Sequence, residues 1–133
     1  MIDLITTTAA DLMSADPVGV SPEASLREAA EIMSRNRIHC LLVDREDPRR
    51  GVGIITGKDI VQLLGEGDPS VLEEISVHDV MSRPAVTVPL EMCVLDCVNL
   101  MLMTGVRTVF VLDGSEPAGL LSFTDVLEFV VGG

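Results

Sequence analysis

The pattern of apolar and polar positions along the chain predicts the same order of elements twice. Short apolar runs bounded by proline or glycine indicate strands, and apolar residues spaced three or four apart indicate helices. In the first half this predicts a short strand within 16–22, strands near 38–43 and 52–55, and helices that begin at Ser25 and after Thr56. In the second half it predicts strands at 86–88, 107–112 and 118–121, and helices at 92–104 and 123–131. The order is β-α-β-β-α in each half.

A short capped helical turn precedes each half, at 8–14 and again at 76–82. Between the halves, Gly65-Glu66-Gly67-Asp68-Pro69 is a strong helix stop, because glycine and proline terminate helices. We therefore expect a first motif at 8–66, a linker at 67–75 and a second motif at 76–131.

One stretch recurs almost unchanged at the end of both halves: Gly53-Ile54-Ile55-Thr56-Gly57-Lys58-Asp59 returns as Gly119-Leu120-Leu121-Ser122-Phe123-Thr124-Asp125. The hydroxyl is expected at a helix N-cap, and the Asp follows one turn later near the positive end of the helix dipole. Two interpretations remain open. The pair can hold a sugar hydroxyl or a phosphate, or it can form only a capping box that satisfies its own backbone.

Composition narrows the function classes. Hydrophobic residues make up 47% of the 133, enough for a core, while Trp and Tyr are absent. A net charge of −12 argues against generic binding of nucleic acid or an anionic membrane, since both rely on clustered Lys and Arg. The odd number of cysteines within apolar runs is typical of reduced thiols in a cytoplasmic protein, and we expect no metal site. We expect neither a signal peptide nor a membrane span, because no charged segment precedes an apolar one and no apolar run reaches about 18 residues.

The predicted helix at 92–104 differs from the others because it is apolar around nearly its whole circumference. Such a helix must be covered on both sides. We expect its outer face to meet a second copy in a homodimer, and the alternative is burial at the centre of the monomer.

The repeated order of elements, closed each time by Gly-aliphatic-aliphatic-Thr/Ser-x-x-Asp, resembles a tandem pair of cystathionine-β-synthase (CBS) domains, also called a Bateman module. The resemblance implies an α+β fold in which two β-α-β-β-α repeats pack with pseudo-twofold symmetry. It further implies clefts between the motifs that bind AMP, ADP, ATP or S-adenosylmethionine. Thr56 and Asp59 would contact ribose in one cleft, and Ser122 and Asp125 in the other.

The resemblance also implies further binding residues. Adenine would lie against the backbone of Ala85 and Val86 over the Asp59 cleft, and of Val18 over the Asp125 cleft. Phosphates would meet His39 and Arg107 at the start of the second strand of each motif. Whether Mg²⁺ accompanies the nucleotide is left open.

The expected function is that of a cytoplasmic regulatory module that senses energy or a metabolite. We expect no catalysis and no catalytic cofactor, because neither histidine has an evident acid partner and no phosphate-binding glycine loop is present. The alternative is a ligand-free dimerisation module.

Overall fold

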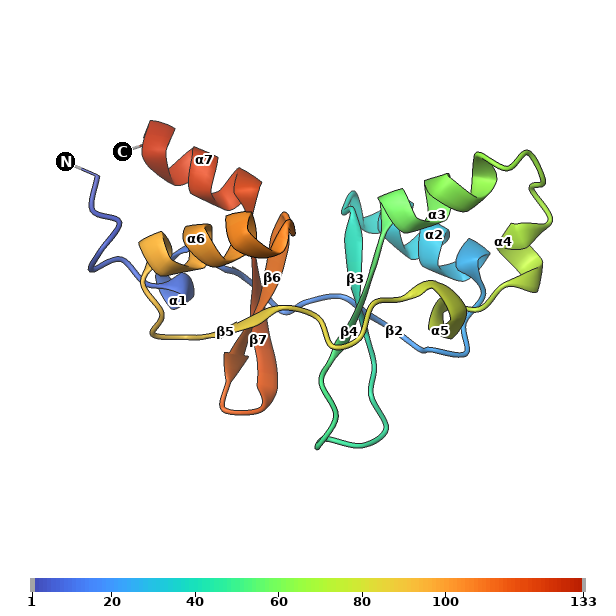
Figure 1. Ribbon diagram of the computed structural model, residues 1–133, viewed down its shortest axis with the longest axis horizontal. Coiled ribbons are helices and arrows are strands. Elements are labelled where there is room, and N and C mark those ends of the chain that lie inside the picture. Colours follow the sequence, from blue (N-terminus) through green and yellow to red (C-terminus); the bar gives the residue numbers. More distant parts are fainter. Residues whose placement is uncertain (1, 133) are drawn as a thin grey trace. The chain divides into compact units, whose positions relative to one another are not determined.

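A computed structural model describes residues 2–132 of the chain (Figure 1). The chain divides into two compact units. Of the described residues, unit 1 contains 2–17 and 86–132, and unit 2 contains Val18–Ala85.

Each unit contains the opening segment of the other sequence repeat. The first helix and strand of the chain, α1 (Ala9–Leu12) and β1 (Ser14–Ala15), belong to unit 1, where Ser14 pairs with Leu120. The corresponding helix of the second repeat, α5 (Val77–Val80), belongs to unit 2, where the Val77 N–H donates to the Ala24 carbonyl over 2.8 Å. The two repeats therefore exchange their first elements.

Unit 2 is built on a three-stranded sheet in the order β2-β3-β4. β2 (Gly19–Val20) lies parallel to β3 (Cys40–Val43), which pairs antiparallel with β4 (Gly53–Thr56). Besides α5, its helices are α2 (Leu26–Asn36), α3 (Gly57–Leu64) and α4 (Val71–Glu74). Side chains from these elements form one apolar cluster, which includes Leu26, Ala29, Met33, Leu41, Val43, Ile55, Ile60 and Val77.

Unit 1 is built on a four-stranded sheet in the order β1-β7-β6-β5. β5 (Thr87–Pro89) lies parallel to β6 (Thr108–Asp113), which pairs antiparallel with β7 (Glu116–Ser122). Besides α1, its helices are α6 (Val94–Thr104) and α7 (Phe123–Gly132). A second apolar cluster fills this unit and includes Ala9, Val88, Cys97, Met101, Val109, Val111 and Leu121.

The predicted α+β class and the doubled β-α-β-β-α order are confirmed. The helix expected at 92–104 begins at Val94, because Cys93 has an extended backbone and occupies the N-cap. The region expected as a linker, 67–75, contains α4, whose Leu72 packs against the core of unit 2. The pseudo-twofold packing of the two motifs stays a prediction.

No helix within residues 2–132 is both long enough and apolar enough to cross a lipid bilayer.

Candidate functional site

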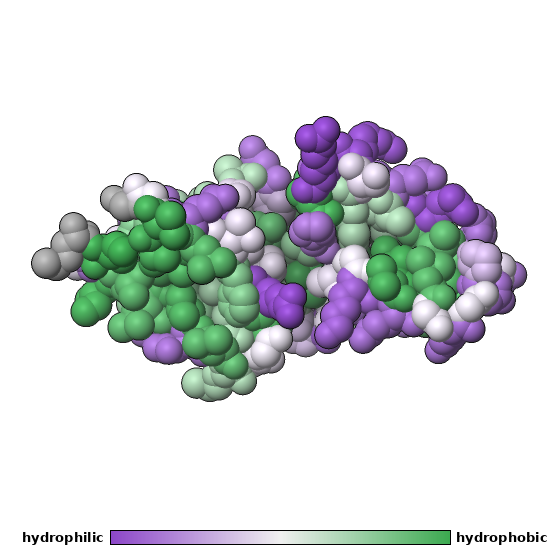
Figure 2. Space-filling view, turned by 90° about the horizontal axis from the view of Figure 1, so that it is seen from above, coloured by the Kyte–Doolittle hydropathy of each residue, from purple (hydrophilic) through white to green (hydrophobic). Residues whose placement is uncertain are grey.

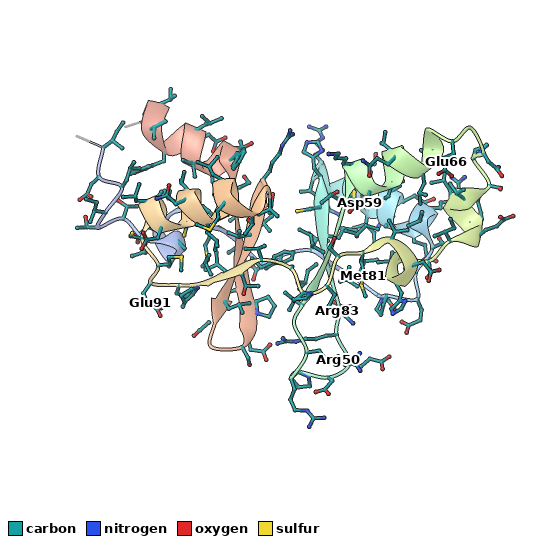
Figure 3. All side chains as sticks on the ribbon, viewed as in Figure 1. Arg50, Asp59, Glu66, Met81, Arg83 and Glu91 are labelled. Atoms are coloured by element: carbon teal, nitrogen blue, oxygen red, sulfur yellow. The ribbon has the colours of Figure 1, made fainter. Side chains whose placement is uncertain are left out.

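Thr56 and Asp59 form a capping box at the start of α3 in unit 2 (Figure 3). The Asp59 backbone N–H donates to Thr56 Oγ1 at 3.3 Å, and Asp59 Oδ2 accepts from the Thr56 backbone N–H at 2.8 Å. The Thr56 hydroxyl also donates to Asp59 Oδ2, at 3.0 Å. These bonds satisfy backbone donors that the first turn of a helix leaves without partners.

Ser122 and Asp125 repeat this geometry at the start of α7 in unit 1. The Asp125 N–H donates to Ser122 Oγ at 3.3 Å, and Asp125 Oδ2 accepts from the Ser122 N–H at 2.8 Å and from its hydroxyl at 3.0 Å. The expected N-cap positions of both hydroxyls are therefore confirmed. The capping-box interpretation describes what both pairs do within the chain.

Each capping carboxylate uses only one of its two oxygens. In both boxes every hydrogen bond to the carboxylate ends on Oδ2, and within residues 2–132 Oδ1 accepts none. Asp59 and Asp125 are half-buried. An ionised oxygen in this position can accept a charge-assisted hydrogen bond from a ligand hydroxyl while Oδ2 continues to cap the helix. Capping and ligand binding are thus compatible in the same residue.

In each unit, a backbone hydrogen bond places a basic residue next to the capping box. The Gly57 N–H donates to the His39 carbonyl at 2.8 Å, and the Phe123 N–H donates to the Arg107 carbonyl at 3.0 Å. Both basic side chains are exposed. His39 and Arg107 therefore leave the sheet beside the N-terminus of α3 and of α7 respectively, where they are free to approach an anion held there.

The three residues expected to contact adenine lie on sheet edges of the separate units. Val18 and Ala85 belong to unit 2, where Val18 O accepts from Leu42 N–H and Ala85 N–H donates to Val52 O. Val86 belongs to unit 1, and its carbonyl accepts from Phe110 N–H. The pairing of Val18 with Asp125 and of Val86 with Asp59 joins residues of different units, so it stays a prediction.

A hollow of about 370 Å³ opens beside Asp125 within unit 1. Its walls come from α1 and from one face of α7, and the lining residues are Asp11, Leu12, Asp125, Glu128, Phe129 and Gly132. Three of these are acidic and none is basic, so the hollow repels phosphate and suits hydroxyls or a cationic group. Sequence reasoning missed Asp11 and Leu12, because the exchange of α1 between repeats has no signal in the local pattern.

The cysteines give no sign of a metal centre. All three are free thiols, and burial raises the pKa of Cys40. The pKa of Cys97 rises to about 11, first through burial and then through the nearby charges of Cys93 and Asp96. A raised pKa disfavours the thiolate that binds metals. Across the part of the chain that the structure describes, no three His, Cys, Asp or Glu side chains are grouped to hold an ion.

The fold and the doubled capping box define a protein made of paired β-α-β-β-α repeats. The family model described as "CBS domain" matches residues 9–66 and 77–132. The chain belongs to the CBS domain family and carries a tandem pair of these domains, as the sequence resemblance implied.

Three relatives illustrate the range of proteins that share this pair. The arabinose 5-phosphate isomerase KdsD of Yersinia pestis is 32% identical over 109 residues, which cover 82% of this chain and 32% of that protein. The hexameric CBS-CP12 protein from bloom-forming cyanobacteria has a TM-score of 0.86 at 25% identity, covering 94% of this chain and 70% of that one. The CBS domain pair of MJ0100 was solved in complex with 5′-methylthioadenosine and S-adenosyl-L-methionine. It has a TM-score of 0.83 at 23% identity, and the match covers 96% of this chain and 98% of that one.

The curated relatives are longer than this chain. The chain spans between 32% and 63% of the length of the four that match it. What those whole proteins do lies partly outside the region that this chain resembles.

Proposed function

We propose that this protein is a non-catalytic regulatory module of the cytoplasm that binds an adenosine-containing ligand through its two Thr/Ser-x-x-Asp caps. The observation that carries the proposal is the free Oδ1 of Asp59 and Asp125. A carboxylate at a helix N-terminus can accept from the vicinal hydroxyls of a ribose, and it does so here without giving up the cap. The adenosine-type ligands of MJ0100 support the same ligand class for this pair.

The charges beside the caps favour some adenosine ligands over others. Asp125 shares its hollow with two further acids, and Arg107 is the basic residue next to that cap. At the Asp125 cap we therefore expect an uncharged or cationic ligand, such as methylthioadenosine or S-adenosylmethionine, to bind more tightly than ATP. At the Asp59 cap, the His39 backbone is bonded to the first residue of α3 and the exposed Lys58 lies in the first turn of that helix, so a phosphate is better tolerated there.

A melting scan with an extrinsic dye tests the proposal, because the chain has no Trp. We expect S-adenosylmethionine or methylthioadenosine at about a hundred times its dissociation constant to stabilise the fold by about 2.7 kcal/mol and to raise the melting midpoint by several degrees. Asp125→Asn keeps an oxygen for the cap and removes the charge. It should abolish most of this shift if the ligand sits at that cap.

Asp79→Asn is the matched control, since Asp79 Oδ2 accepts from the Ser76 hydroxyl at 3.1 Å at the start of the four-residue helix α5, and Asp79 belongs neither to the repeated motif nor to the hollow. It should retain most of the ligand shift. The proposal fails if AMP, ADP, ATP, methylthioadenosine and S-adenosylmethionine all leave the midpoint unchanged at millimolar concentration.

A second candidate function, dimerisation through unit 1, is favoured by the distribution of exposed apolar side chains. Among the described residues, the large hydrophobic side chains that remain exposed lie on unit 1, with the exception of Val61. Leu102 and Met103 on α6 are 65% and 82% exposed, and Leu127 and Val131 extend the surface onto α7. Figure 2 shows hydrophobic side chains gathered over this region. A contiguous apolar surface of this kind is typical of a subunit interface.

Leu102→Glu tests this candidate by placing a charge on the outer face of α6. We expect it to convert a dimer into a monomer at micromolar concentration, measured by light scattering or sedimentation, because a buried unpaired carboxylate is strongly unfavourable at an interface. Val61→Glu is the control, since Val61 is 64% exposed on unit 2 and should leave the assembly unchanged. A wild-type protein that is monomeric under these conditions would rule the candidate out.

A further inference from the structure

The outer surface of unit 1 combines exposed apolar side chains with an excess of negative charge. Leu95, Leu102 and Met103 of α6 and Leu127 and Val131 of α7 are 37% to 85% exposed, and we call these five side chains the apolar face. Both helices pack on the same apolar cluster with their other sides. Figure 2 shows hydrophobic side chains gathered over this unit. Because burial of exposed apolar area is favourable, such a face favours a partner.

The carboxylates of unit 1 have almost no cations to neutralise them. The described residues of this unit contain nine Asp and Glu side chains and a single basic side chain, that of Arg107. None of the nine forms an ion pair with another described residue. Unit 2 is more balanced, with twelve acidic side chains and eight Lys and Arg side chains. Unit 1 therefore has a net charge of −8, out of −12 for the chain.

Two of these carboxylates border the apolar face on its own helices. Asp96 directly follows Leu95 on α6 and precedes Met103 by seven residues, and Glu128 directly follows Leu127 on α7. Both acidic side chains are exposed. Residues seven apart lie on the same side of a helix, because two turns contain about 7.2 residues. A partner that covers the apolar face therefore meets a carboxylate on each helix.

We propose that the apolar face docks a basic amphipathic helix of a partner protein. The apolar side of such a helix covers the exposed leucines of α6 and α7, and its Lys and Arg side chains pair with Asp96 and Glu128. Leu95 and Met103 are eight residues apart, which is about 12 Å along α6, so a partner helix of about three turns spans the face. The face includes neither capping box, so docking is independent of the proposed nucleotide binding.

Charge decides between this occupant and a second copy of the chain. A second copy brings the same unpaired carboxylates to the contact, and like charges placed together across an interface repel. A basic helix instead neutralises them while it buries the same apolar side chains. The charge of unit 1 also opposes contact with an anionic lipid surface. Of these three occupants, the basic helix alone matches the face in both apolar character and charge.

Fluorescence anisotropy with a labelled peptide and the full chain tests the proposal. The probe is the sequence Leu-Lys-Lys-Leu-Leu-Lys-Leu repeated twice, which places leucines on one side of a helix and lysines on the other. We expect saturable binding that weakens between roughly 50 and 300 mM salt, because salt screens the attraction between charges. A peptide of the same composition, with its leucines distributed around the helix, has the same charge and should bind at least about tenfold more weakly.

Three variants locate the bound peptide. Leu102→Ser removes an apolar side chain from the face and should weaken binding about tenfold. Val61→Ser is its matched control, because Val61 is 64% exposed on unit 2, and it should change the affinity less than about twofold. Asp96→Asn removes a charge and keeps the shape, so it should weaken binding about threefold and reduce the dependence on salt.

The proposal is overturned if the peptide does not bind, or if the redistributed peptide or the Leu102→Ser chain binds as tightly as the original pair, since the attraction then comes from charge alone. Sedimentation of the wild-type chain gives the other decisive result. A dimer that the peptide does not dissociate overturns the proposal and identifies a second copy as the occupant. The dye-based melting scan reports nucleotide binding separately, so a chain that binds no adenosine ligand leaves the peptide result unchanged.

Discussion

Leu121→Ala is expected to lower the free energy of unfolding of unit 1 by about 2–5 kcal/mol. Leu121 is fully buried in the apolar cluster of unit 1, together with Val109 on the neighbouring strand. Removing its side chain loses the transfer free energy of the missing methyl groups and leaves a cavity that a close-packed core fills only in part. Leu121 directly precedes Ser122, so the same change loosens the strand that positions the Asp125 cap.

Urea unfolding followed by far-ultraviolet circular dichroism measures this loss. Leu127→Ala is the control, because Leu127 lies on α7 of the same unit and is 62% exposed. Its substitution should change the unfolding free energy by no more than about 0.5 kcal/mol. A cost below about 1 kcal/mol for Leu121→Ala would show that unit 1 does not have the packed core described above.

The elements that sequence reasoning found are those with short-range causes. A cap depends on two side chains three residues apart, so Thr56 with Asp59 and Ser122 with Asp125 could be placed without knowledge of the fold. The amphipathic pattern of α2 is likewise local, and its apolar Leu26, Ala29 and Met33 are buried in the core of unit 2. The apolar outer face of α6 was also visible in its composition.

The features that sequence reasoning missed have long-range causes. The helical turns at 8–14 and 76–82 were predicted, but the unit that each of them joins was not. α1 and α5 are four residues long and gain little stability from their own hydrogen bonds, so the unit they join is decided by packing with distant residues. α4 was not predicted, because glycine and proline precede it. In the structure its Glu73 forms an ion pair with Arg27 on α2, a contact between residues far apart in the sequence. The hollow beside Asp125 depends on α1 and therefore could not be predicted either.

The exchanged segments also explain why glycine opens the repeated motif. They predict that substituting this glycine lowers the free energy of unfolding by different amounts in the two copies. At Gly119 an added Cβ would contact Met13 Sδ and lie 2.8 Å from the backbone carbonyl oxygen of Ser14. At Gly53 it would lie 3.1 Å from both Met81 Sδ and Val43 Cβ and 3.4 Å from the Ser82 carbonyl oxygen. Met81 and Ser82 are the equivalents of Met13 and Ser14 in the other repeat, but the fit is tighter in unit 1.

Gly119→Ala should therefore lower the free energy of unfolding by about 3 kcal/mol, at the upper end of the range for overpacking. The reason is that the backbone of β1 must move away from β7. Gly53→Ala should lower the unfolding free energy by about 1 kcal/mol, since its contacts are all 3.1 Å or longer and Met81 and Val43 need to move by only a few tenths of an ångström. Both values come from the same urea titration. Met13→Ala removes the side-chain part of the clash and should recover some, but not all, of the loss in Gly119→Ala, because the Ser14 carbonyl remains. Equal costs at both glycines would contradict this explanation and would indicate that the glycine is needed for the turn of the chain into the helix rather than for the exchanged strand.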